Sequence, residues 1–387
     1  MRAHGGIKEG PSSWKTEDGN VKLIIEPNDG VAPIVAAIKN ARKSVEIVVF
    51  RFDYGGIEAA LKAAVVKGVK VTALIADANR GGVKSLRDLE MRFLAAGIVV
   101  ARTADDLIRY HDKLIIIDRR TLYMLSFNFT RLDIGRSRGF GIVTKNTRLV
   151  QEAVKLFEAD CTRCTYTPKL DVFVVSPENS RKMLGRFLKR AKKQLLIYDP
   201  KISDKEMIGI LRDRAKAGVE IRIIGRITAR LDLAVKKPTS MRLHTRSIIR
   251  DQHQAFVGSQ SLRSAELDLR RELGLIVRDP KIIKKLADTF ESDWAANGAT
   301  KEREMKKEEA PEIPEKDTEK ATQVLAQELQ PMSLKLKKAV KKAVADAGEE
   351  AFEQKMVKNT VKKMVKKAVK EAVKEVAQEA KELEKSV

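Results

Sequence analysis

An internal repeat is the feature that most constrains how this 387-residue chain folds. Placing His111 on His244 sets a shift of 133 residues (244 − 111). Without a gap, the same shift superposes further identical residues: Arg109 on Arg242, Asp118 on Asp251, Ser126 on Ser259, Arg138 on Arg271, Gly141 on Gly274 and Asp160 on Asp293. A shift that holds across about fifty positions indicates a structural duplication.

Upstream of each histidine, both copies show the same succession of an apolar run, an amphipathic stretch, a glycine and a second apolar run. These segments are 45–50, the stretch to Lys67, Gly68 and 69–75 in the first copy, and 194–198, 207–217, Gly218 and 219–224 in the second. The order predicts strand, helix, left-handed glycine cap and strand, which is the βαβ pattern of an α/β fold. The first copy has 17 extra residues before its histidine (43 against 26 from the glycine), and we expect a helix over 80–97.

The composition divides the chain into five parts. We expect a flexible N-terminus at 1–19, a first lobe at 20–165, a second lobe at 170–296, a charged linker at 297–330 and a basic amphipathic helical tail at 331–387. The linker is rich in Lys, Glu and Pro, which is typical of a solvated segment. The tail has apolar residues at a three-to-four spacing and lacks Pro, which indicates one or two long helices.

The formal net charge of +23 favours anionic partners such as anionic lipid, nucleic acid or phosphate esters. Cys161 and Cys164 are the only cysteines, which excludes a disulfide framework and fits a reducing compartment. The first twenty residues have no apolar core, and no apolar run reaches about 18 residues, so we expect neither a secretory signal nor a transmembrane helix. The expected location is cytoplasmic, with peripheral membrane contact as an open alternative.

Each copy carries a histidine, a cation two residues later and an aspartate five residues beyond the cation. These residues are His111, Lys113 and Asp118 in the first copy and His244, Arg246 and Asp251 in the second. We expect each motif to begin on a strand, where residues two apart share a face. A cation beside a histidine is suited to holding a phosphate next to a nucleophile.

Small polar side chains follow both motifs at a fixed distance: Ser126 and Asn128 in the first copy, Ser259 and Ser261 in the second. They can bind phosphate oxygens by hydrogen bonds. Glu272 lies 28 residues after His244 (272 − 244) and could accept a hydrogen bond from a histidine ring. The alternatives are structural histidines on duplicated strands, turn formation by the Ser and Asn residues, and a surface ion pair for Glu272.

The duplicated motif and its polar clusters resemble the phospholipase D superfamily over roughly residues 20–296. The resemblance implies two similar α-β-α sandwich lobes that share one site at their interface. It also implies a phosphohistidine intermediate and needs no metal or cofactor. By this resemblance the catalytic residues would be His111 (nucleophile), His244 (acid and base), Lys113, Arg246, Asp118, Asp251 and Glu272, and the phosphate-binding residues would be Ser126, Asn128, Ser259 and Ser261.

The sequence departs from the family pattern at three positions. Arg246 stands where the family has Lys, Leu125 replaces the usual Gly before Ser126, and Gly139 occupies the place in the first copy that matches Glu272. We therefore expect His111 to lack the orienting carboxylate that the family provides, unless another residue supplies it.

These observations favour a phosphodiesterase or phosphatidyltransferase acting on phospholipids. A metal-independent nuclease of the same superfamily and a catalytically weak anionic-ligand-binding or scaffold protein remain as alternatives. The tail has seven lysines and no acid between Lys355 and Lys370. It is compatible with self-association, with an anionic membrane surface and with nucleic acid.

Overall fold

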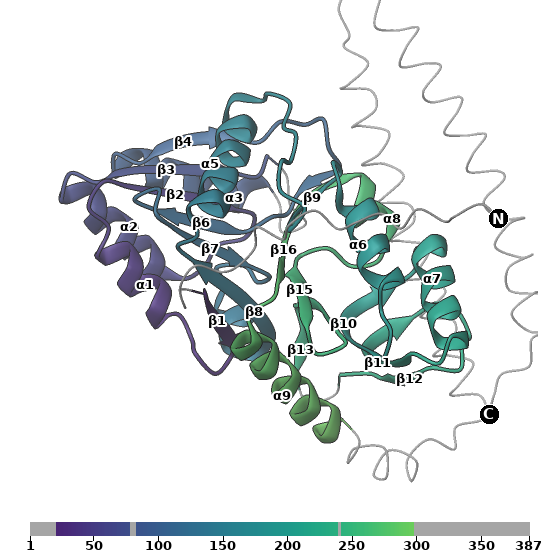
Figure 1. Cartoon of the computed structure of the whole chain (residues 1–387). Coiled ribbons are helices and arrows are strands. Elements are labelled where there is room, and N and C mark those ends of the chain that lie inside the picture. Colours follow the sequence, from purple (N-terminus) through teal and green to yellow (C-terminus); the bar gives the residue numbers. More distant parts are fainter. Residues whose placement is uncertain (1–20, 78–82, 239–240, 298–387) are drawn as a thin grey trace, which may run out of the picture. The chain divides into compact units, whose positions relative to one another are not determined.

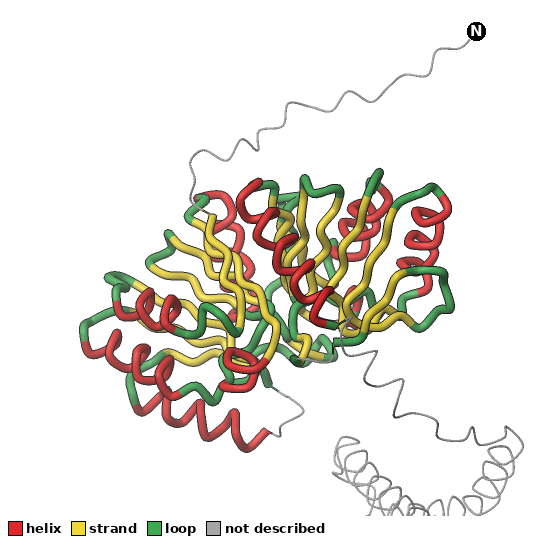
Figure 2. The backbone as a smooth tube through the Cα atoms, turned by 90° about the horizontal axis from the view of Figure 1, so that it is seen from below, coloured by secondary structure: helices red, strands yellow, loops and turns green. Residues whose placement is uncertain are grey.

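The computed structural model describes residues 21–77, 83–238 and 241–297. The expected flexible N-terminus at 1–19 and the basic tail at 331–387 lie outside the described residues, as does the expected linker from residue 298 onwards. The described part contains two lobes, seen in Figure 2 as two groups of strands flanked by helices.

The first lobe alternates strands and helices before it ends in an antiparallel meander and a long helix. Its elements are β1 (Val21–Glu26), α1 (Ala32–Lys39), β2 (Ser44–Val49), α2 (Gly55–Val66), β3 (Lys70–Ile75), α3 (Val83–Ala95), β4 (Val99–Arg102), β5 (Arg109–Tyr110), β6 (Leu114–Ile117), β7 (Thr121–Leu125), α4 (Arg131–Arg136), β8 (Ser137–Thr144) and α5 (Thr147–Thr162). The helix expected over 80–97 is confirmed as α3.

The second lobe repeats this order without a counterpart of α3 (Figure 1). Its elements are β9 (Phe173–Ser176), α6 (Ser180–Lys189), β10 (Gln194–Ile202), α7 (Lys205–Lys216), β11 (Glu220–Ile227), β12 (Ala234–Lys236), β13 (Arg242–Leu243), β14 (Arg246–Arg250), β15 (Gln254–Gly258), α8 (Ser264–Asp268), β16 (Arg270–Val277) and α9 (Pro280–Ala296). The expected glycine caps are confirmed, since Gly68 and Gly218 have φ values of 82° and 83°, which side chains disfavour.

Each lobe is built on one mixed sheet. The strand order is β1-β8-β7-β6-β2-β3-β4 in the first lobe and β12-β11-β10-β14-β15-β16 in the second, where β9 also pairs with β16. The strands β2 and β3 run parallel, as do β10 and β11, because a helix crosses over between them. Continuous runs of buried, largely β-branched side chains, as in β2, suit strands that are covered on both faces.

The two lobes exchange a short strand. β5 of the first lobe pairs in parallel with β16 of the second, and β13 of the second lobe pairs in parallel with β8 of the first. The chain therefore crosses from one sheet to the other just before β6 and again just before β14. Both crossings occur at the motif histidines, so the exchange decides where these side chains lie.

A shared core joins the lobes. Phe140 on β8 packs edge-on against Tyr198 on β10, with ring centres 5.5 Å apart, and Tyr198 packs in the same way on Phe290 of α9 at 5.0 Å. Burying one such aromatic side chain contributes about 1.5–3 kcal/mol. Separate cores lie under α1 and α2 in the first lobe and under α6 and α7 in the second.

Two ion pairs that cross the interface follow the repeat. The guanidinium of Arg138 binds Asp293, and the guanidinium of Arg271 binds Asp160, with shortest distances of 2.7 Å and 2.9 Å. In each pair the arginine comes from one lobe and the aspartate from the other. The conserved spacing within the repeat at these positions is thus explained by packing between the lobes.

Candidate active site

Both motif histidines lie in the crossing segments and not within a strand. His111 follows β5, and its backbone N–H donates to the carbonyl of Arg271 at 2.7 Å. His244 follows β13, and its N–H donates to the carbonyl of Arg138 at 3.0 Å. The expectation that each motif begins on a strand of its own sheet is wrong, because these residues connect the two sheets.

The crossing brings the two imidazole rings together. Their centres lie 6.5 Å apart at an interplanar angle of 57°. Both residues are nearly buried, with 7% of His111 and 6% of His244 exposed. A phosphorus atom placed between the rings would be within reach of a nitrogen from each.

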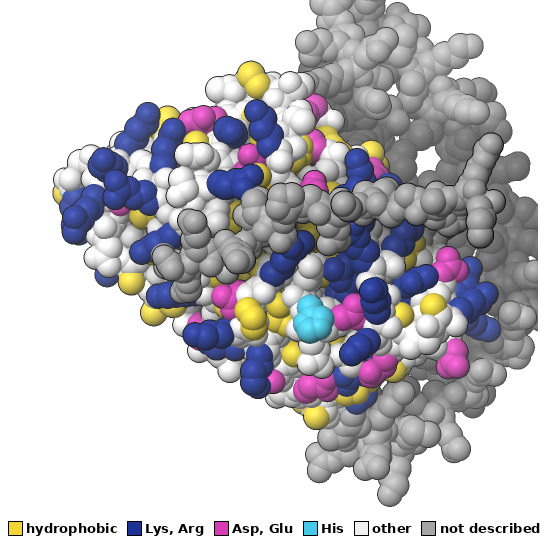
Figure 3. Space-filling model, viewed as in Figure 1, with side chains coloured by type: hydrophobic (Ala, Val, Ile, Leu, Met, Phe, Trp, Pro, Cys, Tyr) yellow, Lys and Arg dark blue, Asp and Glu magenta, His cyan; other side chains and the backbone are white. Residues whose placement is uncertain are grey.

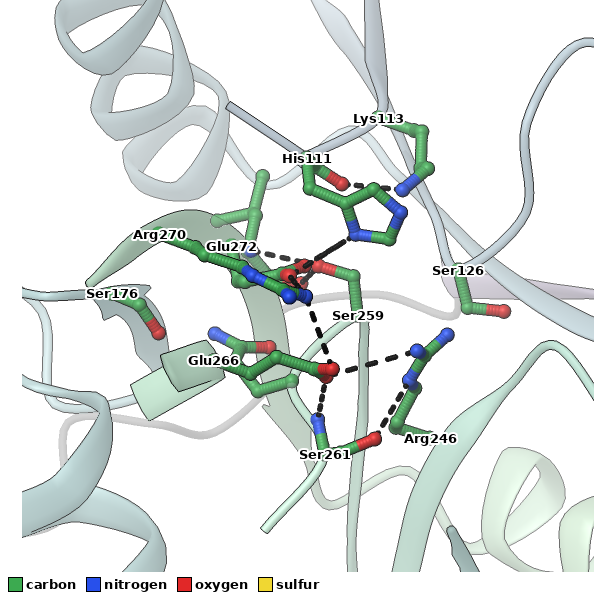
Figure 4. A network of polar contacts seen from close by, with 12 residues as sticks. His111, Lys113, Ser126, Ser176, Arg246, Ser259, Ser261, Glu266, Arg270 and Glu272 are labelled. Atoms are coloured by element: carbon green, nitrogen blue, oxygen red, sulfur yellow. Dashed lines mark hydrogen bonds and ion pairs between the residues drawn. The ribbon is translucent and has the colours of Figure 1, made fainter. Parts of the chain in front are cut away.

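Glu272 orients the ring of His111, as Figure 4 shows. Its carboxylate oxygens lie 2.9 and 3.1 Å from Nδ1, and its side chain is fully buried. The expectation that His111 lacks an orienting acid is wrong. The acid comes from the other lobe, because the strand exchange places β16 beside β5.

His244 is oriented by a backbone group. Its Nδ1 lies 3.0 Å from the carbonyl oxygen of Ser126, which can only accept, so Nδ1 carries a proton. A carboxylate equivalent to Glu272 is excluded here, because a Cβ on Gly139 would lie 2.8 Å from the ring of Phe127. The two halves of the site are therefore chemically different although their backbones match.

Two cations flank the rings. Lys113 is 1% exposed, and its ammonium donates to the carbonyl of His111. Arg246 donates to the carbonyl of His244 at 3.0 Å and to Oγ of Ser261 at 3.1 Å. The arginine thus takes the position of the expected lysine and keeps its charge.

Burial sets the protonation of this group. It lowers the pKa of His111 well below its ordinary value, and the charges of Lys113 and Arg246 lower it further. It lowers the pKa of His244 to about 3 against the opposing charge of Asp133. It lowers the pKa of Lys113 to about 7 and raises that of Glu272 to about 8, where Glu266 adds to the rise. An anionic phosphodiester between the rings would offset the cations and favour protonation of a histidine.

The four polar residues expected to bind phosphate divide into two kinds. Oγ of Ser126 accepts from the N–H of Phe140 at 2.9 Å, and Oγ of Ser259 accepts from the N–H of Leu273 at 3.1 Å. These hydroxyls link neighbouring strands, so the turn-and-backbone interpretation applies to them. Asn128 lies 3.4 Å from Nε2 of His244, so it remains placed at the site.

Ser261 also remains at the site, through Arg246.

Asp118 and Asp251 do not reach the histidines, contrary to the expected catalytic role. The carboxylate of Asp118 accepts from the N–H groups of residues 42–44, and that of Asp251 from those of residues 192–194. Both follow a buried strand and have φ values near 54°, so they occupy the turn at its far end. Each aspartate holds a loop to its own sheet.

The sequence interpretation missed two buried acids. Asp133 lies 3.6 Å from Nε2 of His244 and accepts from Nδ2 of Asn128 at 2.6 Å. Glu266 lies 3.7 Å from Arg246 and accepts from the N–H of Ser261 at 2.7 Å. They are related by the shift of 133 residues, so an acid at both positions of the repeat was the signal that could have revealed them.

The sequence model of the family described as "Cardiolipin synthase, PLD-like domain" matches residues 34–161 and 225–294, which is about half of the chain. The chain belongs to this family. Membership in the phospholipase D superfamily, expected from the duplicated motif, is thereby confirmed.

Solved structures show that the fold of this phospholipase D-like protein is shared by two-lobed members. Polyphosphate kinase from Porphyromonas gingivalis aligns with a TM-score of 0.61 at 20% identity over 71% of this chain; the chain spans 50% of that kinase. Phosphatidylserine synthase from Haemophilus influenzae aligns with a TM-score of 0.54 at 12% identity, over 72% of this chain and 86% of the synthase. No curated protein matches the sequence.

These likenesses confirm the expected α/β class with two similar lobes. Within the described residues of this phospholipase D-like protein, no helix is both long and apolar enough to cross a bilayer.

Proposed function

We propose that the protein cleaves or transfers phosphodiesters of phospholipids through a phosphohistidine on His111. The observation that carries the proposal is the pair of rings 6.5 Å apart, one from each lobe, between Lys113 and Arg246. The expected roles of Asp118 and Asp251 are not part of it.

The roles of the histidines follow from their partners. With Nδ1–H donating to an ionised Glu272, Nε2 of His111 presents a lone pair that can attack phosphorus. The bond from phosphorus to the leaving alcohol breaks, and Nε2 of His244 gives its proton to that oxygen. Water or an acceptor alcohol then attacks phosphorus, His244 takes up a proton, and the phosphorus–nitrogen bond to His111 breaks.

The cations stabilise the charge that develops during both steps. Lys113 and Arg246 are nearly buried, with 1% of Lys113 and 12% of the arginine side chain exposed. Electrostatic stabilisation is stronger where water is excluded. Asn128, close to His244, is suited to donate to a phosphoryl oxygen.

Apolar side chains near the site support a lipid substrate. Ile108 lies three residues before His111, and Leu269 lies three residues before Glu272; they are 65% and 47% exposed. The N–H of Ile108 donates to the carbonyl of Leu269, so the two residues are neighbours. An exposed apolar pair beside a cationic site suits an amphiphilic substrate.

The test is incubation of the full chain with mixed phospholipid vesicles and, separately, with DNA, in the presence of a chelator. We expect release of a head group or exchange of an acceptor alcohol, and a phosphate trapped by rapid denaturation on His111. His111→Ala should abolish both, whereas the exposed His253 is the site of the control variant His253→Ala. Cleavage of DNA alone would favour the nuclease instead, for which the net charge of +23 speaks. Turnover of neither substrate, with no labelled histidine, would leave the scaffold interpretation.

A further inference from the structure

Lobe 2 carries a group of arginines far from the two histidines. Arg186 and Arg190 lie at the end of α6, Arg250 ends β14, and Arg278 follows β16. We call these four residues the arginine cluster. They line a cavity of about 90 Å³ between α6 and the ends of the two strands.

Arg250 forms the base of this cavity and is held in place. It is 9% exposed, and it donates to the carbonyl of Phe187 at 2.9 Å and to the side-chain oxygen of Gln254 at 2.5 Å. Its guanidinium lies 4.4 Å from the ring centre of Phe187, which is favourable for a cation. The base of the cavity is therefore a positioned cation.

The charge of the cluster is not balanced by acids. Burial lowers the pKa of Arg250; Asp251 opposes this shift, whereas Arg190 and Arg278 add to it by repulsion. The acid nearest to Arg186 is Asp171, at 3.9 Å and 80% exposed, and such pairs contribute about 0–1 kcal/mol. Among the described residues, Arg190 and Arg278 have no ion-pair partner.

The duplication shows that the fold does not require these cations. Before the motifs the lobes are related by a shift of 150 residues, since Asp118 binds residues 42–44 and Asp251 binds residues 192–194. That shift places Ala36 at Arg186 and Asn40 at Arg190, and the shift of 133 places the buried Ile117 at Arg250.

Only Arg278 has a basic counterpart, Lys145. Lobe 1 thus builds the same helix and strand with small or apolar side chains. Three cations gathered at one place in lobe 2 alone indicate a ligand that compensates their repulsion.

The size and chemistry of the cavity fit a phosphate group. About 90 Å³ corresponds to roughly three water molecules. Guanidinium groups bind phosphate oxygens in pairs, with short hydrogen bonds. Beyond Arg186 and Arg190 the surface continues along α6 into a cleft of about 730 Å³ that also carries Lys182 and Lys189, which leaves room for the rest of a larger molecule.

We propose that the arginine cluster is a second phosphate-binding site, distinct from the histidine site. It recognises a single phosphate group, either free or in the head group of an anionic lipid. Arg250 and Arg246 occupy opposite ends of β14, roughly 13 Å apart at about 3.3 Å per residue. One phosphate cannot contact both sites, so the cluster is independent of the proposed reaction.

The experiment uses the full chain and the lobe 1 residues as replacements. Calorimetric titration with inorganic phosphate should reveal two sites in the unmodified protein. The double variant Arg186→Ala/Arg190→Asn should lose one of them or weaken it at least about tenfold, which is 1.4 kcal/mol. Turnover of a soluble phosphodiester should stay within about twofold. The control is Arg212→Ala/Lys216→Asn, which removes the same charge from exposed positions on α7.

Arg250→Ile is the second test, because it places the lobe 1 residue at the base of the cavity. It should also remove this phosphate site, and the unfolding curve of each variant shows whether the fold is kept. Vesicles of phosphatidylcholine with and without phosphatidic acid distinguish the sources. Loss of binding to the acidic vesicles in the double variant assigns a lipid head group, and unchanged vesicle binding assigns free phosphate. Two phosphate sites of unchanged affinity in the double variant, or a single site in the unmodified protein, would overturn the proposal.

Discussion

Nδ1 of His111 lies 2.9 Å from a carboxylate oxygen of Glu272, although 161 residues separate them in the chain. The contact exists because β5 leaves its own lobe and pairs with β16 of the other. Figure 4 shows the carboxylate directed at the ring and separate from the Glu266 network around Arg246. Orientation of the nucleophile in one lobe thus depends on the other lobe.

Replacing Glu272 by Gln should lower kcat by about 10²–10⁴-fold with little change in KM, because the ring loses the charge that fixes its tautomer. Glu272→Asp should restore part of the activity. Steady-state turnover is the measurement, with the exposed Glu291 changed to Gln as the control for loss of one negative charge. Equal activity of Glu272→Gln and Glu291→Gln would contradict the assigned role.

The pH profile of kcat/KM should be bell-shaped with a maximum between about 7 and 8. The nucleophilic form requires ionised Glu272, whose pKa is raised to about 8, so the rate increases as pH rises towards that value. The charged form of Lys113, whose pKa is lowered to about 7, is lost as pH rises through that value, so the rate then falls. Lys113→Arg should remove the alkaline fall, because arginine stays charged.

Profiles of both proteins on one soluble phosphodiester decide this point. An alkaline limb at the same pH in Lys113→Arg would show that another group causes it.

The leaving group should control the effect of His244. With an alkoxide leaving group, His244→Ala should reduce turnover by about 10²–10⁴-fold, the range of general acid catalysis. With p-nitrophenolate, which leaves without a proton, the first step should proceed and phosphorylated His111 should accumulate. Quenched-flow detection of the nitrophenolate burst measures this. A burst equally absent with both substrates would assign the acid role elsewhere.

The sequence predicted the features that are local or periodic. The repeat register, the βαβ order, the glycine caps at Gly68 and Gly218 and the added helix α3 all depend on neighbouring residues. The pairing of a two-residue strand such as β5 carries no such signal, because either sheet offers it the same backbone partners. Assignment of Glu272 to the wrong histidine followed from this, since spacing along the chain says nothing about an exchange between lobes.

The far ends of the motifs were misassigned for a related reason. Asp118 and Asp251 occur at a fixed distance from the histidines, and that distance was interpreted as chemistry. The structure shows that four-residue and five-residue strands, β6 and β14, separate them from the site. A repeated spacing records a repeated backbone, and only the contacts show which of its residues serve the reaction.

Asp118→Ala should therefore reduce stability and leave catalysis almost unchanged. The variant loses the acceptor of the N–H groups of Arg42, Lys43 and Ser44, and loss of such a cap costs about 1–2 kcal/mol. Asp251→Ala should behave in the same way in lobe 2. Urea unfolding and kcat measured below the transition check this, and a loss of kcat comparable to that of Glu272→Gln would restore the aspartates to the catalytic group.

The ion pair between Arg138 and Asp293 should contribute to both stability and activity. The guanidinium makes bonds of 2.7 and 2.8 Å to the two carboxylate oxygens, and the side chains are only 8% and 12% exposed. Arg138→Ala leaves the carboxylate uncompensated at the interface, which costs about 3–5 kcal/mol.

The carbonyl of Arg138 also accepts from the N–H of His244, so loosening this segment should lower kcat as well. Arg119→Ala is the matched control, because that arginine is 53% exposed and its pairs with acids contribute about 0–1 kcal/mol. Denaturant unfolding of both variants tests the difference. If Arg138→Ala were no less stable than Arg119→Ala, the exchanged strands alone would hold the lobes together.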